Sequence, residues 1–547
     1  MLTESESPPE QDSIESPSLL RGVAVGVLST FAGLAVAEVV TGLYRGASSP
    51  ILPVGQEVID ATPKSVRDWA IESFGTSDKA VLVLGTLFSL AVIGSIVGIL
   101  AVKGRLVAAY TVTGVVGLIG VWAVLERPAP TFAKLLPPVA GTLTSLAVLW
   151  YLAGRGREHA AAGALDGDVT AGGGIGRRSF VQAAVTIGFI AALAAVVGRL
   201  LKGRFDVDEE RADLELPAAS DTAAPVGTLP ASGAPEAPVG AGDATDFGIE
   251  GVTPWVVPNA DFYRIDTALA VPQVPKDSWS LQIHGMVDRE VRLTFADLLR
   301  RPMIERYITL SCVSNEVGGD LVGNALFQGV RFKDVLDEAG VQPEATQVVS
   351  RSIDGWSCGS PTAVIMDGRD AMVAIAMNGE PLPPEHGYPV RLVVPGLYGY
   401  VSATKWVTEI ELTRWEDFDA YWIPRGWAKE GPVKTMARID RPRRNKSYSA
   451  SAEGVIDVAG VAWAVHRGIS KVEVSIDEGE WRECELAGVP SDDTWRQWRY
   501  RWNGAPAGDH DVRARAYDGA GEPQPEEPKA VAPDGAQGHH RVPFTVD

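Results

Sequence analysis

Five long apolar runs dominate the first 205 residues of the chain. They cover Gly22–Leu43, Ala80–Val102, Leu106–Leu125, Leu135–Ala153 and Phe180–Leu201. Each has about the 20 residues that an α-helix needs to cross the hydrocarbon core of a bilayer. The pattern therefore predicts that residues 1–204 form a five-helix transmembrane bundle that anchors a multi-pass protein in the cell membrane.

Basic residues between the runs predict the orientation of this bundle. Lys103 and Arg105 follow the second run, and Arg177 and Arg178 precede the fifth. Because cytoplasmic loops carry the excess of Lys and Arg, the N-terminus is expected inside and everything after Leu201 outside. The segment Gly176-Arg-Arg-Ser-Phe-Val resembles a twin-arginine export signal, although an ordinary positive flank would look the same.

The composition changes after the fifth run. Residues 205–250 begin with several acids and continue as a Pro/Ala/Gly/Ser stretch with almost no large apolar side chain. Such a segment cannot bury enough surface to fold, so it predicts a flexible linker.

Two further domains follow the linker. In residues 251–430, strand-like alternation at Trp279–Ile283 and Glu305–Ser311 encloses the helical spacing of Thr294–Leu299, which predicts an α+β domain. Residues 431–547 contain several short strands with turn signals and no helical period, which predicts an immunoglobulin-like β-sandwich.

Charge and cysteine content exclude some functions. The formal net charge of −20 repels nucleic acid, so we expect no nucleic-acid partner. Three cysteines cannot form a disulfide framework. None of the seven histidines lies in an apolar run, and the chain has neither a CxxCH haem site nor an iron–sulfur cysteine cluster, so no haem is expected and the electron carrier stays unidentified.

The most informative cysteine is Cys312. It follows a predicted strand in Thr309-Leu-Ser-Cys-Val-Ser-Asn-Glu-Val-Gly-Gly319, where backbone amides can approach a ligand. A cysteine in this position can be a nucleophile, a metal ligand or a small buried residue. The spacing alone does not decide between these roles.

A second motif lies about 65 residues further on. It runs from Met377 through Glu385-His-Gly-Tyr-Pro-Val-Arg391 and ends with Ser402-Ala-Thr-Lys-Trp406. Together with the Cys312 segment, it resembles the sulfite oxidase family of molybdopterin-dependent oxidoreductases, of a membrane-anchored bacterial type. The resemblance covers about residues 255–547.

This resemblance implies a cofactor of molybdenum bound to one molybdopterin. It implies that Cys312 is the metal ligand, that Cys312, Arg264 and Trp356 are catalytic, and that the C-terminal sandwich forms a homodimer. The implied cofactor-binding residues are Tyr263, Arg264, Cys312, Asn315, Asp354, His386, Arg391, Ser402, Thr404 and Lys405. An always-charged Arg and a Lys suit a phosphate monoester.

The chain also departs from the family pattern. Asp266 replaces a cofactor-site histidine, Val317 and Val401 occupy stretches in which sulfite-oxidising members carry arginines, and Trp356 falls where they carry a Tyr. These departures predict poor binding of sulfite, and Arg264, Arg425 and Arg541 are the arginines that would have to replace the lost charge.

We therefore expect a membrane-anchored molybdopterin-dependent oxidoreductase that transfers an oxygen atom and two electrons to or from a small substrate on the outer face. The alternatives on the same cofactor are an S- or N-oxide reductase and a sulfite oxidase proper. The non-enzymatic alternative is a membrane-tethered binding protein in which Cys312 holds no metal.

Overall fold

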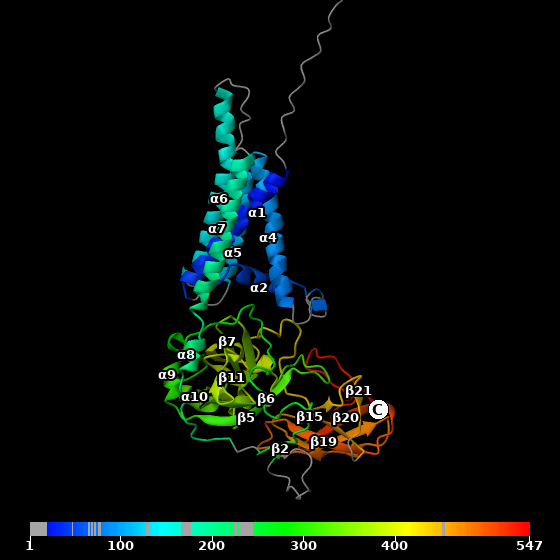
Figure 1. Ribbon diagram of the computed structural model, residues 1–547. Helices are drawn as coiled ribbons and strands as arrows, with labels where there is room; N and C mark the ends of the chain where they lie inside the picture. The colour runs from blue at the N-terminus through cyan, green and yellow to red at the C-terminus, as the bar shows by residue number, and fades with distance from the viewer. Residues whose placement is uncertain are drawn as a thin grey trace, which may run out of the picture. The chain divides into compact units, whose positions relative to one another are not determined.

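The computed structural model describes residues 19–45, 47–63, 66, 69, 73–74, 78–126, 132–165, 177–223, 227–228, 244–450 and 454–547. The chain divides into two compact units, residues 1–206 and 207–547. Each unit is drawn in Figure 1.

Unit 1 contains the five predicted apolar helices, each long and apolar enough to cross a membrane. They are α1 (Leu19–Leu43), α4 (Asp78–Val102), α5 (Leu106–Leu125), α6 (Phe132–Leu165) and α7 (Arg177–Gly203). The prediction of five helices is confirmed. The sequence pattern missed α2 (Ile51–Ala61), a short helix with one apolar face.

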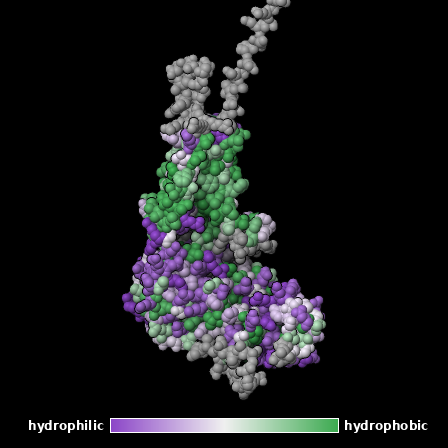
Figure 2. All heavy atoms as spheres, in the orientation of Figure 1, coloured by the Kyte–Doolittle hydropathy of each residue, from purple (hydrophilic) through white to green (hydrophobic). Residues whose placement is uncertain are grey.

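Glycine allows these helices to approach closely. A Cβ atom at Gly26 of α1 would lie 1.7 Å from the carbonyl oxygen of Gly94 in α4, and one at Gly33 would lie 2.4 Å from that of Gly141 in α6. Small residues at such crossings are typical of packing within a membrane. The outward face of unit 1 is apolar (Figure 2), with Phe88, Leu118 and Phe189 exposed.

The first part of unit 2 corrects the prediction of a flexible linker over residues 205–250. Val207 is buried in the core of unit 2, and the backbone N–H of Ser220 donates to the carbonyl of Met303 at 2.9 Å. The short helix α8 (Asp208–Ala212) supplies Glu210, which accepts from the backbone of Lys276. Scattered apolar residues and ion pairs bind this acidic segment to the domain. Residues 224–226 and 229–243 lie outside the described residues.

Two five-stranded sheets build the region between residues 280 and 413. The strands are β3 (Ser280–Gly285), β4 (Val291–Thr294), β5 (Ile304–Ser311), β6 (Val322–Arg331), β7 (Gln347–Ser352), β8 (Ser357–Pro361), β9 (Met372–Met377), β10 (Glu380–Pro381), β11 (Arg391–Val393) and β12 (Val407–Thr413). One sheet has the order β10-β9-β6-β5 with β11 also paired to β9, and the other has the order β4-β3-β12-β7-β8. Helices α9 (Phe295–Leu299), α10 (Phe332–Ala339) and α11 (Thr362–Met366) complete the predicted α+β pattern.

The C-terminal region contains two more sheets over one apolar core. Their orders are β13-β15-β19-β18 and β14-β21-β20-β16-β17. The strands are β13 (Met436–Arg441), β14 (Ser447–Tyr448), β15 (Val455–Trp463), β16 (Ile469–Ile476), β17 (Arg482–Glu483), β18 (Glu485–Leu486), β19 (Arg496–Asn503), β20 (Gly508–Asp518) and β21 (His540–Val546). Two facing sheets agree with a sandwich, while its immunoglobulin-like topology and its role in dimerisation stay predictions.

Besides this second core, the larger apolar core of unit 2 extends past the predicted boundary at residue 430. Met436, Trp463 and Trp495 from the C-terminal region are buried in the same apolar cluster as the strands between residues 280 and 413. The two regions therefore share part of one core and belong to one compact unit.

Candidate active site

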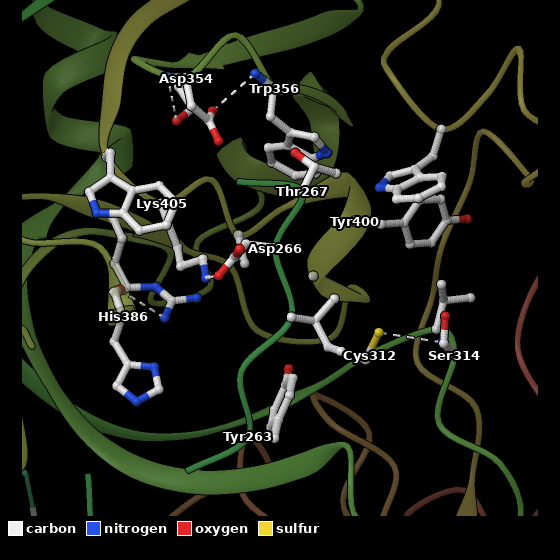
Figure 3. Close-up of a pocket in the computed structure, with 18 of the residues that line it drawn as sticks. Tyr263, Asp266, Thr267, Cys312, Ser314, Asp354, Trp356, His386, Tyr400 and Lys405 are labelled. Atoms are coloured by element: carbon white, nitrogen blue, oxygen red, sulfur yellow. Dashed lines mark hydrogen bonds and ion pairs between the residues drawn. The ribbon is translucent and has the colours of Figure 1, made fainter. Parts of the chain in front are cut away.

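Cys312 lies in the turn that follows β5, as its sequence pattern indicated. Its backbone N–H donates to Leu321 O at 2.9 Å, and the N–H of Ser314 donates to its Sγ atom at 3.4 Å. The thiol is 8% exposed and lines a pocket (Figure 3). Burial raises the pKa of Cys312, so a metal that binds the sulfur must displace its proton.

The C-terminal sandwich holds the Cys312 turn from behind. The imidazole of His540 packs against Gly318, where an added Cβ atom would lie 2.2 Å from Nε2. Arg438 donates to the carbonyl of Gly319 at 3.0 Å and to the hydroxyl of Thr253 at 2.7 Å. Through these contacts the sandwich fixes the position of the turn that carries Cys312.

Two buried cations lie on one side of the pocket. Arg391 begins β11, is 5% exposed and donates to the carbonyl of His386 at 3.2 Å. No carboxylate in the described part of the chain pairs with it, and burial lowers its pKa to about 10. Lys405 donates to Asp266 at 2.7 Å and to the carbonyl of Glu385 at 3.1 Å, and burial lowers its pKa to about 8. A buried guanidinium without a carboxylate is costly unless an anion binds it.

Asp266 explains the position of Arg264. Its carboxylate is nearly buried and accepts both from Lys405 and, at 2.8 Å, from Nε of Arg264. Arg264 is therefore turned toward its neighbour two residues on, and its side chain does not line the pocket. The predicted contact of Arg264 with the substrate or the cofactor stays a prediction.

The other side of the pocket is aromatic. Trp356, Tyr400, Trp422 and Trp427 line it, with the rings of Tyr400 and Trp427 6.0 Å apart. In Figure 3, Tyr400 and Ser314 lie on one side of Cys312, and His386 and Lys405 lie on the other. The sequence motifs indicated Trp356, but Tyr400, Trp422 and Trp427 were missed because nothing in their spacing marks them as neighbours of Cys312.

Three predicted cofactor residues support the pocket without lining it. Ser402 donates to the carbonyl of Tyr398 at 2.9 Å, and the hydroxyl of Thr404 lies 2.6 Å from that of Ser350. Asn315 accepts from the backbone N–H of Leu321 at 2.8 Å, and its buried Nδ2 has no hydrogen-bond partner in the described part of the chain. Ser402 and Thr404 thus hold the loops around the pocket, and their predicted contact with the cofactor stays a prediction. Tyr263, Asp354, Trp356, His386, Arg391 and Lys405, which were also predicted for the site, line the pocket with Cys312.

Arg425 and Arg541, the two other arginines that could replace the lost positive charge, also lie outside the pocket. The guanidinium of Arg425 stacks on the ring of Tyr421 at 3.7 Å, and Arg541 in β21 pairs with Asp511 at 2.7 Å. Neither lines the pocket. Val317 and Val401, the two positions at which the family pattern has arginines, do not line the pocket either. Neither Arg425 nor Arg541 therefore brings a positive charge to the aromatic side.

The residues present fit a molybdenum–molybdopterin group. Cys312 offers one soft sulfur ligand, and in the described part of the chain no three His, Cys, Asp or Glu side chains gather to hold a metal by themselves. The other ligands must therefore belong to the cofactor. Arg391 and Lys405 suit its phosphate, and the unsatisfied Nδ2 of Asn315 is a donor next to the metal-binding turn.

We expect stability to depend on His386 in mild acid. Burial lowers the pKa of this residue to about 4, so the unfolded chain binds its proton first as the pH falls from about 6.5. The folded state should lose up to about 3 kcal/mol between pH 6.5 and pH 4. Thermal unfolding of the cofactor-free chain measures this effect, and His386→Gln should show a weaker fall in Tm over the same range. An equal fall in Tm in the wild type and in His386→Gln would show that His386 does not cause the loss of stability.

Known proteins share this region. Residues 268–422 match the family model described as an oxidoreductase molybdopterin binding domain. Over 153 residues the chain is 37% identical to the uncharacterized oxidoreductase YuiH of Bacillus subtilis, covering 28% of this chain and 74% of that protein. It is 29% identical over 318 residues to the mitochondrial sulfite oxidase of Drosophila melanogaster, covering 49% of this chain and 55% of that protein.

The match to human mitochondrial sulfite oxidase is similar, at 27% identity over 328 residues, with 51% of this chain and 58% of that protein covered. The chain thus spans little more than half the length of these sulfite oxidases. Among solved structures, the sulfane dehydrogenase SoxCD of Paracoccus pantotrophus matches with 24% identity and a TM-score of 0.43, over 51% of this chain and 76% of that one. The cysteine turn, the buried cations, the family model, YuiH and the sulfite oxidases together place the chain in the sulfite oxidase family of molybdopterin-dependent oxidoreductases, whose cofactor is molybdenum bound to molybdopterin.

Proposed function

We propose that this enzyme reduces a small uncharged S- or N-oxide on the outer face of the membrane. The aromatic side of the pocket carries the proposal. The cations that line the described pocket are Arg391, which donates to the carbonyl of His386, and Lys405, which lies with His386 on one side of Cys312 in Figure 3. This side suits the cofactor phosphate. An oxyanion at the aromatic side would lose its hydration without a charged partner, whereas a neutral oxide would lose little.

The bound cofactor and the residues that line the pocket have different roles in the proposed reaction. When bound, the molybdenum centre exchanges an oxygen atom and two electrons with the substrate. Trp356, Trp422 and Trp427 exclude water and pack against the substituents of the oxide. Tyr263 points its hydroxyl into the pocket (Figure 3), and burial raises its pKa, so it keeps its proton and can donate to the substrate oxygen.

A substrate panel tests this function. The full chain, loaded with its cofactor and supplied with a reduced dye, should reduce a dialkyl sulfoxide or an amine N-oxide. Trp427→Ala should raise the KM for a bulky sulfoxide about tenfold, since one large aromatic contact is lost. Trp502→Ala removes the same side chain from the distant sandwich strand β19 and serves as the matched control, in which KM should not change. Absence of turnover with every neutral oxide in the panel would refute the proposal.

The location on the outer face rests on the loop charges and on Arg177 and Arg178, where α7 begins. The side chains of these two arginines lie outside the described residues. Replacing both with Lys keeps the positive charge but removes the guanidinium pair of an export signal. We expect unit 2 to become inaccessible to protease added to intact cells. Unchanged access would identify the pair as a simple topological flank.

A further inference from the structure

Unit 1 contains a cavity that the proposed function has not used. Its volume is about 510 Å³, within the range of roughly 300–1,000 Å³ that small-molecule sites occupy. Its wall comes from α1, α2, α4, α5 and α6 and is mostly apolar. It is therefore large enough for a lipid-soluble ring and the first part of an isoprenoid tail.

The cavity extends from the middle of the bundle toward one end. Gly42 of α1 packs beside Leu201 of α7, so these two helices end together, and Gly33 packs against Ser145, so α6 starts at that end. The cavity is lined by the second half of α1 and by the first part of α6, while Val54 and Val58 of α2 close its end. It thus extends toward the end of the bundle at which α7 ends and the chain leaves for unit 2.

Two hydroxyls in the cavity wall favour a ligand with hydrogen-bond acceptors over an acyl chain. Thr86, Ser89, Thr113 and Thr142 each donate to the carbonyl four residues earlier in their own helix. Thr30 and Ser145 also line the cavity, but neither makes a hydrogen bond within the described part of the chain. In an apolar surrounding such donors gain from a bound acceptor, and an acyl chain has none. The carbonyl oxygens of a quinone are acceptors of this kind.

We infer that this cavity binds a quinone or its quinol as the two-electron carrier of the enzyme. The inference rests on the proposed reduction of an oxide and names its reductant. One dialkyl sulfoxide and one quinol become one dialkyl sulfide, one quinone and one water: the quinol gives two electrons and two protons, the S–O bond breaks, and its oxygen leaves as water. No histidine lies in the five apolar runs, so a bis-histidine haem cannot carry these electrons through the bundle.

Two glycines provide a matched test. Gly85 lines the cavity and Gly114 of α5 does not, yet a Cβ atom at either position meets no atom within 4 Å. Gly85→Leu should fill the cavity without disturbing the backbone, and Gly114→Leu adds the same side chain elsewhere in the bundle. The full chain is placed in nanodiscs, and equilibrium binding of a tritiated decyl-benzoquinone is measured, with the naphthoquinone analogue as a second probe.

We expect saturable binding to the wild type and to Gly114→Leu, and at least about tenfold weaker binding to Gly85→Leu. The double variant Thr30→Val, Ser145→Ala keeps the cavity open, and it should bind several-fold more weakly. Binding that matches empty nanodiscs, or that is equal in the wild type and Gly85→Leu, would overturn the inference. So would a retained phospholipid that the quinone does not displace.

Turnover separates this inference from the proposed function. Gly85→Leu should lose quinol-dependent oxide reduction and keep dye-dependent reduction within about twofold, which also shows that the variant folds. If the wild type reduces no oxide with the dye, the proposed function fails, while the binding isotherm still decides what the cavity holds. If dye-dependent reduction works and the quinol neither binds nor donates, only the quinone site is refuted.

Discussion

Cys312→Ser should keep the fold and abolish turnover, with a loss of at least about a thousandfold in kcat. A serine hydroxyl is nearly the size of a thiol, but its oxygen is a hard, poorly ionised ligand, whereas a thiolate suits this metal. Since Cys312 is the only predicted protein ligand, no neighbouring side chain in the described part of the chain is expected to replace it. Molybdenum content, pterin fluorescence and turnover are measured on the same preparation.

Cys358 provides the matched control. Its thiol is fully buried and lies 3.1 Å from the hydroxyl of Ser350 and 3.2 Å from that of Thr404, outside the pocket lining. Cys358→Ser should retain metal and turnover, with a modest loss of stability. A fully active Cys312→Ser variant, or equal losses in both variants, would refute the assignment of Cys312 as the metal ligand.

The second large effect concerns sulfite. With an artificial acceptor, we expect kcat/KM for sulfite to be lower by roughly two to four orders of magnitude than in an ordinary efficient enzyme, which means well below about 10⁶ M⁻¹s⁻¹. Each missing charge-assisted contact costs about 1.5 to 3 kcal/mol, and two arginine positions of the family are Val317 and Val401 here. The net charge of −20 adds a general repulsion of anions.

A charge at the aromatic side should partly reverse this defect. Trp356→Arg would bring a guanidinium into the pocket lining, and it should raise kcat/KM for sulfite about tenfold while reducing that for a neutral oxide. Trp356→Gln removes the same ring without adding charge and should not help sulfite. A wild-type kcat/KM for sulfite above about 10⁶ M⁻¹s⁻¹ would show that the pocket obtains its cations from residues other than those named here.

Features that depend on short stretches of chain were predictable. Membrane-length helices follow from the length and apolarity of each run alone, so all five were predicted, although α6 continues past the predicted end at Ala153 to Leu165. Cys312, His386, Arg391 and Lys405 lie in contiguous motifs, and the structure brings all four to one pocket. In these cases the information is local, because neighbours in sequence determine either the helix or the motif.

Other features required the tertiary structure. Apolar side chains scattered through an acidic segment do not indicate what they will contact, so residues 207–223 were predicted to be a linker although they pack on the domain. Asp266 binds Lys405, 139 residues away, and thereby turns Arg264 out of the pocket. Trp422, Trp427 and the cavity beside Gly85 likewise arise where distant segments meet. Residue type and short-range spacing determined the anchor and the metal-binding motif, whereas the substrate side of the pocket was decided by long-range packing, which no local pattern encodes.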